Sequence, residues 1–388
     1  MEQLPQLRQK IDEIDREIVR LYEQRMEVAE KVADYKRSVG RAVLDKEREN
    51  QKIAAVKSLA STQFNAQGVE ALFGQLMSIS RMRQYTLIAQ TQKEPFGFTE
   101  NPQTTSKDTK VVFAGVKGAY GQQAMEGYFG TEIDSFDVPT FKEAVAAVSS
   151  GQAEYGVLPI ENSSTGSITD VYDLLSANDN YIVGEYILNI EHALLGYPGA
   201  KIEDIRTVYS HPQGLLQCRK FLGSHDWKSI SLENTAIAAK KVLDDKDVTQ
   251  AAVASIRAAR YYGLEILAEK INDINNNATR FIIIKHAKQY KKNSDKISIC
   301  FELPHKTGSL YHILAHFIFN GLNMSSIESR PIRGMKWQYR FFIDVEGNLA
   351  DPAVINALTG VMAETEKFRI LGNYLSAKQT DAQYVKSV

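Results

Sequence analysis

The chain has 388 residues and a formal net charge of -1, and its 44% hydrophobic and 24% charged residues are typical of a folded protein. Its length exceeds what one hydrophobic core usually serves, so two or three domains are expected. The near-neutral charge excludes a field that would gather nucleic acid or an anionic membrane, and any anion site must therefore be local.

The N-terminal segment, MEQLPQLRQKIDEIDRE, is charged throughout and lacks the apolar core of a signal peptide. No run in the sequence approaches the roughly 18 apolar residues that are typical of a membrane span. We therefore expect a cytoplasmic protein with no membrane partner.

From Leu7 to Tyr35, stripe positions recur alternately every four and three residues, which predicts one long helix with a heptad stripe. A stripe of this length is typical of a helix that packs along a partner, so a homodimer or a higher homo-oligomer is expected. Further helices are predicted from about Asp45 to Ala60 and from about Gly68 to Gln90. Residues 93–109, rich in Pro, Thr, Ser and Asn, are predicted to form a linker.

Cations interrupt the first stripe. Arg25 occupies one of its core positions, where a buried and unpaired guanidinium would be costly, so the position demands an anion. The alternative is an arginine that pairs with a nearby glutamate or extends out of the stripe. Lys36 lies on the same face as Arg25, whereas Arg8 lies roughly 100° away and could meet the same site from another chain.

The other two helices also carry polar residues on otherwise apolar stripes. Glu49 is in register with Ile53 and Val56, and the third helix has two polar members in its stripe. Together with the first helix, they predict a pocket for a small dianion that also carries a hydroxyl. The polar residues of these two helices are Asp45, Arg48, Glu49, Ser80 and Gln84.

The segments LRQKIDEIDREIVRLYEQR, VADYKR, LDKERE and SISRMRQ resemble the all-helical chorismate mutases over residues 4 to 90. The resemblance implies a swapped dimer of three-helix chains that isomerises chorismate to prephenate without a cofactor. Such a rearrangement needs no acid or base; it needs the compact conformer held and the developing charge on the ether oxygen stabilised. The resemblance further implies carboxylate-binding arginines, donors to the ether oxygen, and residues beside the ring hydroxyl or lining the site. The arginines implied are Arg8, from the partner chain, Arg25 and Arg48, and the implied donors are Lys36 and Gln84. Glu49 and Asp45 would lie beside the ring hydroxyl, and Ser80 would line the site.

After the linker, short apolar runs such as VVFAG, YGVLPI and FIII alternate with helical segments, which is typical of α/β layers and allows two similar lobes. Polar or glycine-containing turns follow several of these runs, namely GVKGAYG, PIENSSTGS, SHPQG and ENTA, and NNNAT precedes FIII. Any one of them could be a solvated loop. Several at strand ends predict a shared crevice that encloses a small anion.

The segments YGVLPIENSSTGSITDVYDLL, VYSHPQ and ATRFIII resemble prephenate dehydratase over about residues 110 to 286. The resemblance implies that prephenate loses carbon dioxide and its ring hydroxyl together, with Thr279 as the central catalytic residue and Arg280 shaping the site. Departure of hydroxide needs a hydrogen-bond donor, and our hypothesis is that Thr279 acts as that donor or as a relay. The implied cleft residues are Glu161, Asn162, Ser163, Ser164, Ser210, His211, Gln213, Asn234 and Thr235.

The last segment, from ISICFEL to FRILGNY, is predicted to have the order βαββαβ. His312 and His316 are four apart on its first helix, but with no third ligand evident a packing or surface role is favoured, and no metal site is expected. Cys218 and Cys300 lie far apart and lack ligand spacing, so neither a disulfide nor a zinc site is expected.

This C-terminal segment resembles an ACT domain, a sensor of small molecules that pairs at its edges into dimers. KTGSL and ESRP match the two segments by which dehydratase-linked ACT domains bind phenylalanine. The resemblance implies L-phenylalanine as an allosteric inhibitor that shifts the chain from an open active form to a closed inhibited one. The implied effector-binding residues are Gly308, Ser309, Leu310, Glu328, Ser329 and Arg330.

The expected fold is multidomain. Its parts are an all-α three-helix domain (1–92), a linker (93–109), a two-lobed α/β domain like that of periplasmic binding proteins (110–286), an α+β βαββαβ domain (295–376) and a tail (377–388). The expected function is conversion of chorismate to prephenate and then to phenylpyruvate, without a cofactor and under feedback inhibition by L-phenylalanine.

Two alternatives remain at this point. One is a non-catalytic sensor of amino acids or aromatic acids, which the intact set of cations together with Thr279 disfavours. The other is a monofunctional dehydratase whose helical segment only dimerises. Arg25 disfavours that function, because a pure dimer seam would favour leucine at its position.

Overall fold

The computed structural model describes residues 3–89, 95–101, 105–106, 108–274, 276–306, 308–332 and 334–377. Parts of the predicted linker (93–109), Asn275, Thr307 and nearly all of the predicted tail (377–388) lie outside the described residues. None of the helices in the described ranges combines the length and the apolar content needed to cross a membrane. The chain divides into two compact units, Met1–Gly97 with Cys300–Arg369, and Phe98–Ile299 with Ile370–Val388.

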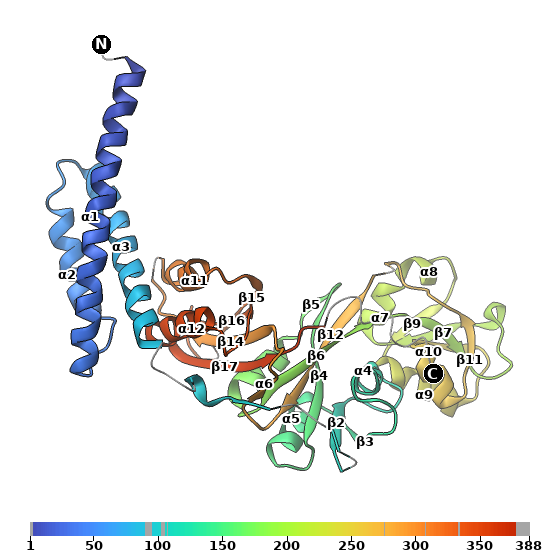
Figure 1. Ribbon diagram of the computed structural model, residues 1–388. Coiled ribbons are helices and arrows are strands. Elements are labelled where there is room, and N and C mark those ends of the chain that lie inside the picture. Colours follow the sequence, from blue (N-terminus) through green and yellow to red (C-terminus); the bar gives the residue numbers. More distant parts are fainter. Residues whose placement is uncertain are drawn as a thin grey trace. The chain divides into compact units, whose positions relative to one another are not determined.

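The first unit begins with the three predicted helices, α1 (Leu4–Ser38), α2 (Lys46–Lys57) and α3 (Gln63–Ala89) (Figure 1). The Asp45 side chain caps α2 by accepting a hydrogen bond of 3.0 Å from the Arg48 backbone amide. α3 begins earlier than predicted, because the Thr62 hydroxyl accepts a hydrogen bond from the Asn65 amide and starts the helix there.

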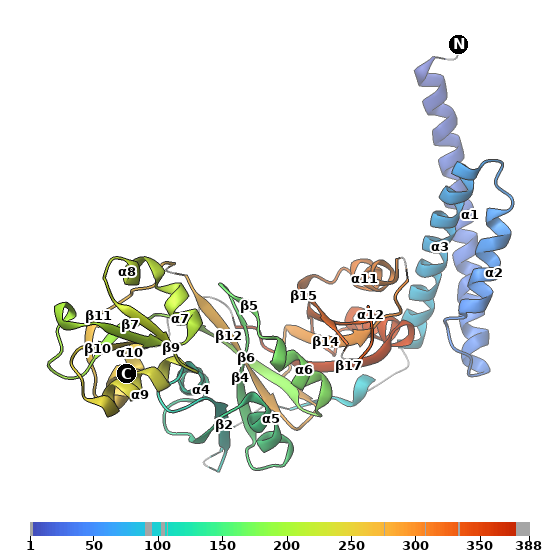
Figure 2. The same ribbon diagram turned by 180° about the vertical axis from the view of Figure 1, so that it is seen from behind.

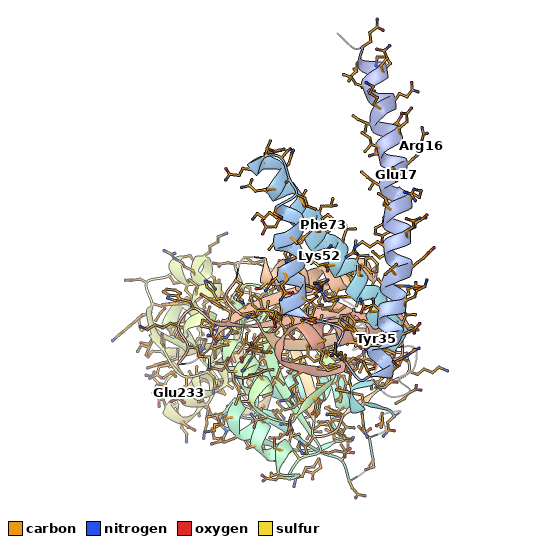
Figure 3. The ribbon with its side chains drawn as sticks, turned by 90° about the vertical axis from the view of Figure 1, so that its left-hand side faces the viewer. Arg16, Glu17, Tyr35, Lys52, Phe73 and Glu233 are labelled. Atoms are coloured by element: carbon orange, nitrogen blue, oxygen red, sulfur yellow. The ribbon has the colours of Figure 1, made fainter. Side chains whose placement is uncertain are left out.

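The apolar stripe of α1 is largely exposed. Ala29 and Ala33 are the buried residues of α1, whereas Ile14 on the stripe is 59% exposed. The N-terminal part of α1 extends past α2 and α3, as both ribbon views show (Figures 1 and 2), and Arg16 and Glu17 lie on this part (Figure 3). A contiguous exposed apolar face of this kind is typical of an interaction surface.

The rest of the first unit holds α11 (Ser309–Phe319), β15 (Met324–Pro331), β16 (Tyr339–Glu346) and α12 (Pro352–Glu364). Flanked by β14 (Lys296–Glu302) and β17 (Glu366–Tyr374), they follow the predicted order βαββαβ. α12 packs against both α3 and α11. A Cβ atom on Gly360 of α12 would lie 2.4 Å from His316 Nδ1, so glycine permits the close approach of α11.

The second unit has two α/β lobes, which confirms the two-lobed expectation. The first lobe is built on a sheet with the order β6-β12-β4-β2-β3, in which β12 is antiparallel to both of its neighbours. Its core includes Val111, Phe113, Met125, Phe281 and Ile283. The elements of this lobe are β2 (Lys110–Ala114), α4 (Tyr120–Phe129), β3 (Asp134–Val138), α5 (Phe141–Ser149), β4 (Tyr155–Asn162), β5 (Gly166–Ser167), α6 (Thr169–Ala177), β6 (Tyr181–Asn189) and β12 (Ala278–Lys285).

The second lobe has a separate five-stranded sheet with the order β11-β7-β10-β8-β9. Its strands are β7 (Ala193–Gly196), β8 (Thr207–Ser210), β9 (Lys228–Ser231), β10 (Gln250–Ala254) and β11 (Glu265–Ala268). Its helices are η2 (Ile202–Asp204), α7 (Pro212–Gln217), α8 (Arg219–Gly223), α9 (Thr235–Asp245) and α10 (Ile256–Tyr262). Shorter elements elsewhere are η1 (Pro95–Gly97), β1 (Thr99–Glu100) and β13 (Gln289–Tyr290).

Replacing Gly372 with alanine should destabilise the second unit. Gly372 of β17 pairs with Ile182 of β6, and a Cβ atom at this position would lie 2.0 Å from the Ile182 carbonyl oxygen. Because a backbone atom cannot rotate away, Gly372→Ala should cost about 1–3 kcal/mol. A lowered thermal unfolding midpoint, followed by circular dichroism, checks this. Gly68→Ala on α3 is the matched control, because no atom lies within 4 Å of a Cβ atom placed at Gly68. Alanine's higher helix propensity should raise the free energy of unfolding of this variant by about 1 kcal/mol. Equal midpoints for the two variants would contradict the prediction.

Candidate active sites

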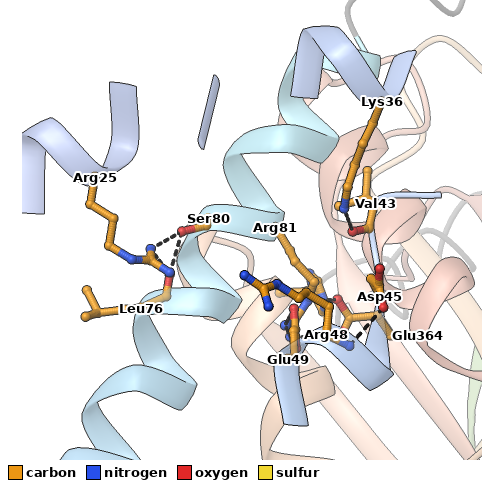
Figure 4. A network of polar contacts seen from close by, with 11 residues as sticks. Arg25, Lys36, Val43, Asp45, Arg48, Glu49, Leu76, Ser80, Arg81 and Glu364 are labelled. Atoms are coloured by element: carbon orange, nitrogen blue, oxygen red, sulfur yellow. Dashed lines mark hydrogen bonds and ion pairs between the residues drawn. The ribbon is translucent and has the colours of Figure 1, made fainter. Parts of the chain in front are cut away.

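The three helices enclose a cavity of about 270 Å³. It lies where α1, α2 and α3 meet, and a cluster of its polar side chains is drawn in Figure 4. Of the eight residues predicted for this site, the cavity brings together Arg25, Lys36, Asp45, Arg48, Glu49, Ser80 and Gln84.

Arg25 reaches from α1 toward α3. Its guanidinium donates hydrogen bonds to the Leu76 carbonyl oxygen, at 3.0 Å, and to the Ser80 hydroxyl (Figure 4). Burial lowers the pKa of Arg25, and the charge of Glu49 opposes this effect. Because its acceptors here are neutral groups, the half-buried guanidinium can still take a carboxylate as its ion-pair partner.

Two further donors border the same cavity. Lys36 donates a hydrogen bond to the Val43 carbonyl oxygen. Gln84 is buried, and its Oε1 atom has no hydrogen-bond partner among the described residues. A buried acceptor without a partner is costly, and a ligand that donates a hydrogen bond to Gln84 Oε1 would remove that cost, while the Nε2 group of the same amide can donate to the ligand.

Arg8 is absent from this cavity. Seventeen helical residues separate it from Arg25, which corresponds to about 25 Å along α1 at 1.5 Å per residue. Its predicted role therefore requires that it come from another chain.

Sequence analysis missed Arg81, which also lines the cavity. Its Nη1 atom lies 2.6 Å from each carboxylate oxygen of Glu49. The available signal was spacing, because Met77, Arg81 and Gln84 fall on one face of α3 at intervals of four and three.

The second candidate site is a cleft of about 430 Å³ between the two lobes of the second unit. Its walls come from the ends of strands and the beginnings of helices in both lobes. The predicted residues that line it are Asn162, His211, Gln213, Asn234, Thr235 and Thr279.

Thr279 lies in β12 and is 8% exposed. Its hydroxyl oxygen accepts a hydrogen bond of 2.8 Å from Asn162 Nδ2. The orientation of this amide is fixed, because Asn162 Oδ1 accepts hydrogen bonds from the backbone amides of Ser164 and Thr165, at 3.0 and 3.2 Å. Because the Asn162 amide nitrogen is a donor and cannot accept a hydrogen bond from Thr279, the hydroxyl hydrogen of Thr279 remains available to a ligand.

The beginnings of several helices line the cleft. The first residues of α4, α5 and α9, which are Tyr120, Phe141 and Thr235, all line it, as does His211, the residue that caps α7. The side chains of His211 and Asn234 cap their helices by accepting hydrogen bonds from Gln213 and Ile237 amides. Backbone amides at helix N-termini favour anions, so a carboxylate suits this cleft.

A chain of hydrogen bonds in the cleft was not predicted. His192 contacts the Tyr120 hydroxyl through Nδ1 and Gln217 Oε1 through Nε2, both at 2.9 Å. Gln217 in turn donates to the Ser164 hydroxyl at 2.8 Å. Burial lowers the pKa of His192, despite its bond to Gln217, and raises that of Tyr120, so both groups are held neutral. These residues come from four separate segments, and only the position of Gln217, four residues after Gln213, was a signal in the sequence.

Several predicted residues lie elsewhere. Arg280 follows Thr279 on a strand and therefore points to the opposite face, where it contacts Glu185 at 2.7 Å and the Tyr374 hydroxyl at 2.9 Å. Glu161 is on that face as well, 3.8 Å from Arg280. Two of the remaining hydroxyls serve the local backbone: Ser210 donates to the Val253 carbonyl oxygen, and Ser163 accepts from the Ala278 amide. Ser164 does not line the cleft itself, but its hydroxyl accepts from Gln217 and donates to Asn162 Oδ1.

The predicted effector residues belong to two elements. Gly308, with a φ angle of +78°, precedes α11, which begins with Ser309 and Leu310. Glu328 and Arg330 share one face of β15, and Ser329 lies on the other.

The histidines and cysteines show no metal-binding arrangement. No group of three or more His, Cys, Asp or Glu side chains in the described part of the chain is placed to hold a metal ion. His316 is buried and lies 3.3 Å from Glu364. Both cysteines are buried free thiols, and burial raises the pKa of Cys218 to about 12 and that of Cys300 to about 11.

Known families match the two segments of the chain that contain the candidate sites. The sequence profile of type II chorismate mutase matches residues 7–85, and that of prephenate dehydratase matches residues 111–289. The chain is 32% identical to the bifunctional chorismate mutase/prephenate dehydratase of Neisseria gonorrhoeae, over 95% of this chain and 96% of that protein.

Solved structures resemble about two thirds of the chain. A prephenate dehydratase from Arthrobacter aurescens, in complex with L-Phe, is 29% identical, with a TM-score of 0.65 over 69% of this chain and 90% of its own. GqqA, described as a novel type of quorum-quenching acylase, is 31% identical, with a TM-score of 0.64 over 69% of this chain and 98% of its own.

Stability should fall as the pH is lowered through about 6.5, the usual pKa of histidine. The pKa values of His192 and His211 are lowered by burial, so the unfolded chain binds more protons than the folded chain in this range. Unfolding midpoints measured at pH 7.5 and 5.5 check the loss. His192→Asn should reduce the difference between the two midpoints, whereas the exposed control His305→Asn should not. An unchanged difference in His192→Asn would contradict this assignment.

Proposed function

The chain belongs to the family of bifunctional chorismate mutase/prephenate dehydratases, and we propose that it converts chorismate to prephenate in the helical cavity and prephenate to phenylpyruvate in the cleft. The observation that carries the proposal is the pairing of the two sites within one chain. One site is lined by cationic side chains and a carboxylate. The other is lined by a threonine hydroxyl and by the first residues of several helices.

In the helical cavity, the cations hold the two carboxylates of chorismate. Arg25 takes one carboxylate, and Arg8 of the partner subunit takes the other, with Arg48 at the rim. Lys36 and Gln84 donate to the ether oxygen, which gains negative charge as its bond to the ring breaks. Glu49, assisted by Asp45, accepts a hydrogen bond from the ring hydroxyl, and Ser80 completes the wall. Rate enhancement comes from holding the reactive conformer and from these donors, without proton transfer.

In the cleft, the electrons of the breaking bond to carbon dioxide flow into the ring, and the ring hydroxyl leaves as hydroxide. The free hydrogen of Thr279 is aimed at that leaving group, because Asn162 occupies the acceptor side of its hydroxyl. The departing hydroxide takes up one proton, which solvent supplies directly or through the Thr279 hydroxyl acting as a relay, so the products are phenylpyruvate, carbon dioxide and water. Backbone amides at the starts of α4, α7 and α9 hold the remaining carboxylate.

The helical cavity is complete only in a dimer under this proposal. Arg8 lies about 25 Å along α1 from Arg25, and the exposed apolar stripe of α1 offers the surface for a second chain. The homodimer therefore serves catalysis as well as assembly.

Regulation by L-phenylalanine belongs to the C-terminal α+β part, which we propose to be an ACT domain. Two points support it: the order βαββαβ, and the bound L-Phe of the similar Arthrobacter aurescens dehydratase. The expected contacts are the residues at the start of α11 and those along β15, which are Gly308, Ser309, Leu310, Glu328, Ser329 and Arg330. Arg280 and Glu161 would act indirectly, from the face of the sheet opposite the cleft.

Matched variants at the two sites should separate the two activities. Lys36→Met should lower mutase turnover by about a hundredfold or more and leave the conversion of added prephenate intact, because it removes the donor to the ether oxygen. Thr279→Val should abolish dehydration and leave the mutase intact, and Thr279→Ser should restore part of the dehydration. Chorismate, prephenate and phenylpyruvate are followed separately in each assay.

The outcomes distinguish the alternatives. Dehydration that survives in Thr279→Val would contradict the role of Thr279. A wild-type chain that consumes prephenate but not chorismate would be a monofunctional dehydratase, and one that binds both without turnover would be a sensor. Hydrolysis of acylated amines in place of both reactions would favour an acylase activity like that described for GqqA. Dehydration unaffected by added L-phenylalanine would contradict the regulatory part.

Mixing two inactive chains should restore mutase activity. Arg8→Ala and Lys36→Met each damage one contribution to a shared site, so a mixed dimer has one intact site. Random re-association of equal amounts should recover about a quarter of wild-type activity, since half of the dimers are mixed and each has one good site of two. No recovery after verified subunit exchange would show that Arg8 does not act across the dimer.

A further inference from the structure

Arg81 joins the helical cavity to the C-terminal part of the first unit. Its Nη1 atom lies 2.6 Å from both carboxylate oxygens of Glu49 on α2, and its Nε atom lies 2.7 Å from Glu364 Oε1 at the end of α12. A second bond of 3.3 Å links Nη2 to Glu364 Oε2. The three side chains form a clamp, the Glu49–Arg81–Glu364 clamp, which is drawn in Figure 4.

The clamp is buried at its centre. The side chains of Arg81 and Glu364 are 8% and 7% exposed, and that of Glu49 is 24% exposed. Burial alone would lower the pKa of Arg81, but the two carboxylates raise it. Burial would likewise raise the pKa of Glu364, but His316 and Arg81 lower it. Arg81 and Glu364 are therefore both charged at neutral pH.

Such a charge set is a weak means of stabilising a helix contact. Desolvation of buried ions cancels much of their attraction, and well-packed apolar residues of similar volume often stabilise a contact as well or better. α3 and α12 are in contact, and both helices carry buried apolar residues that can pack without charges, such as Met82 on α3 and Leu358 and Val361 on α12. The clamp is therefore better explained by what it does to Glu49.

The clamp also forms a wall between two cavities. Glu49, Met77 and Arg81 line the helical cavity and also a second cavity of about 290 Å³ between α2, α3 and α11, where Glu364 joins them. The C-terminal part thus contributes the carboxylate that lies directly behind the charged wall of the mutase site.

We propose that Arg81 is a positioning residue of the mutase centre and that Glu364 holds it in place, so that mutase turnover depends on the C-terminal part of the chain. This inference rests on the proposed mutase function of the helical cavity. Glu364 takes the Nε and Nη2 side of the guanidinium, which leaves Nη1 for Glu49. The guanidinium fork then fixes the direction of the Glu49 carboxylate, and the second carboxylate offsets part of the arginine charge, so Glu49 remains a good acceptor for the substrate hydroxyl.

Glu364→Gln tests this arrangement with little change in shape. Turnover of chorismate should fall by roughly tenfold, the scale expected for a misdirected contact, while KM changes less than about twofold. Conversion of added prephenate by the same sample should be unchanged and serves as the folding control. Glu70→Gln is the matched control variant, because the exposed ion pair of Glu70 with Lys57 also links α2 to α3. It should leave both activities unchanged.

A double-mutant cycle separates positioning from simple structural support. If Glu364 acts through Glu49, Glu364→Gln should cause no further loss in a Glu49→Gln background. Arg81→Lys provides a second entry to the cycle should Glu364→Gln fold poorly, because lysine keeps the charge but cannot reproduce the fork between two carboxylates. It should lower turnover only when Glu49 is present.

Each outcome decides the inference. If the Glu364→Gln variant has the same mutase activity as the wild type and the Glu70→Gln control, the inference is overturned. It is also overturned if Glu364→Gln, or Arg81→Lys in its place, lowers turnover by the same factor whether residue 49 is glutamate or glutamine. A wild-type chain without any mutase activity would instead overturn the proposed function on which the inference rests.

Discussion

Strand β12 is hydrogen-bonded along both edges, to β4 and to β6, and this double pairing determines where its polar residues point. Thr279 faces the cleft and Arg280 the opposite side, because neighbouring residues on a strand alternate. The pairing with β4 also brings Asn162 beside Thr279, and the backbone amides of Ser164 and Thr165 orient that asparagine. The sheet itself thus leaves free the hydroxyl hydrogen of Thr279, which we propose assists dehydration. A residue in a mobile loop would have no such constraint.

Under the proposed function, the two sites recognise similar dianions by different means. The helical cavity uses side-chain cations, since the middle of a helix has no free backbone donors and Arg25 and Lys36 must supply them. The cleft offers helix N-termini and neutral side chains instead, because strand ends and helix starts meet there. Each choice suits its reaction. A rearrangement gains from fixed positive charge at the ether oxygen, whereas dehydration gains from a donor that can follow the leaving hydroxide.

Local patterns were enough to predict the helices of the first unit, the order βαββαβ, the two lobes, and the residues that gather around Arg25 and Thr279. What sequence patterns could not predict depends on contacts between distant segments. The bond between Arg81 and Glu364 joins residues from opposite ends of the chain, and the link from His192 to Gln217 joins two segments of the second lobe. Arg280 shows another limit: the motif that places it beside Thr279 in sequence says nothing of the face it occupies, although strand alternation alone would have placed it away from the cleft.

The central claim is that one chain carries two successive activities. A single time course with chorismate, in which prephenate and phenylpyruvate are quantified separately, tests it most directly. The account predicts that chorismate disappears, that prephenate rises and then falls, and that phenylpyruvate accumulates to match the chorismate consumed. Prephenate that accumulates without phenylpyruvate, or chorismate that persists while added prephenate is consumed, would contradict it.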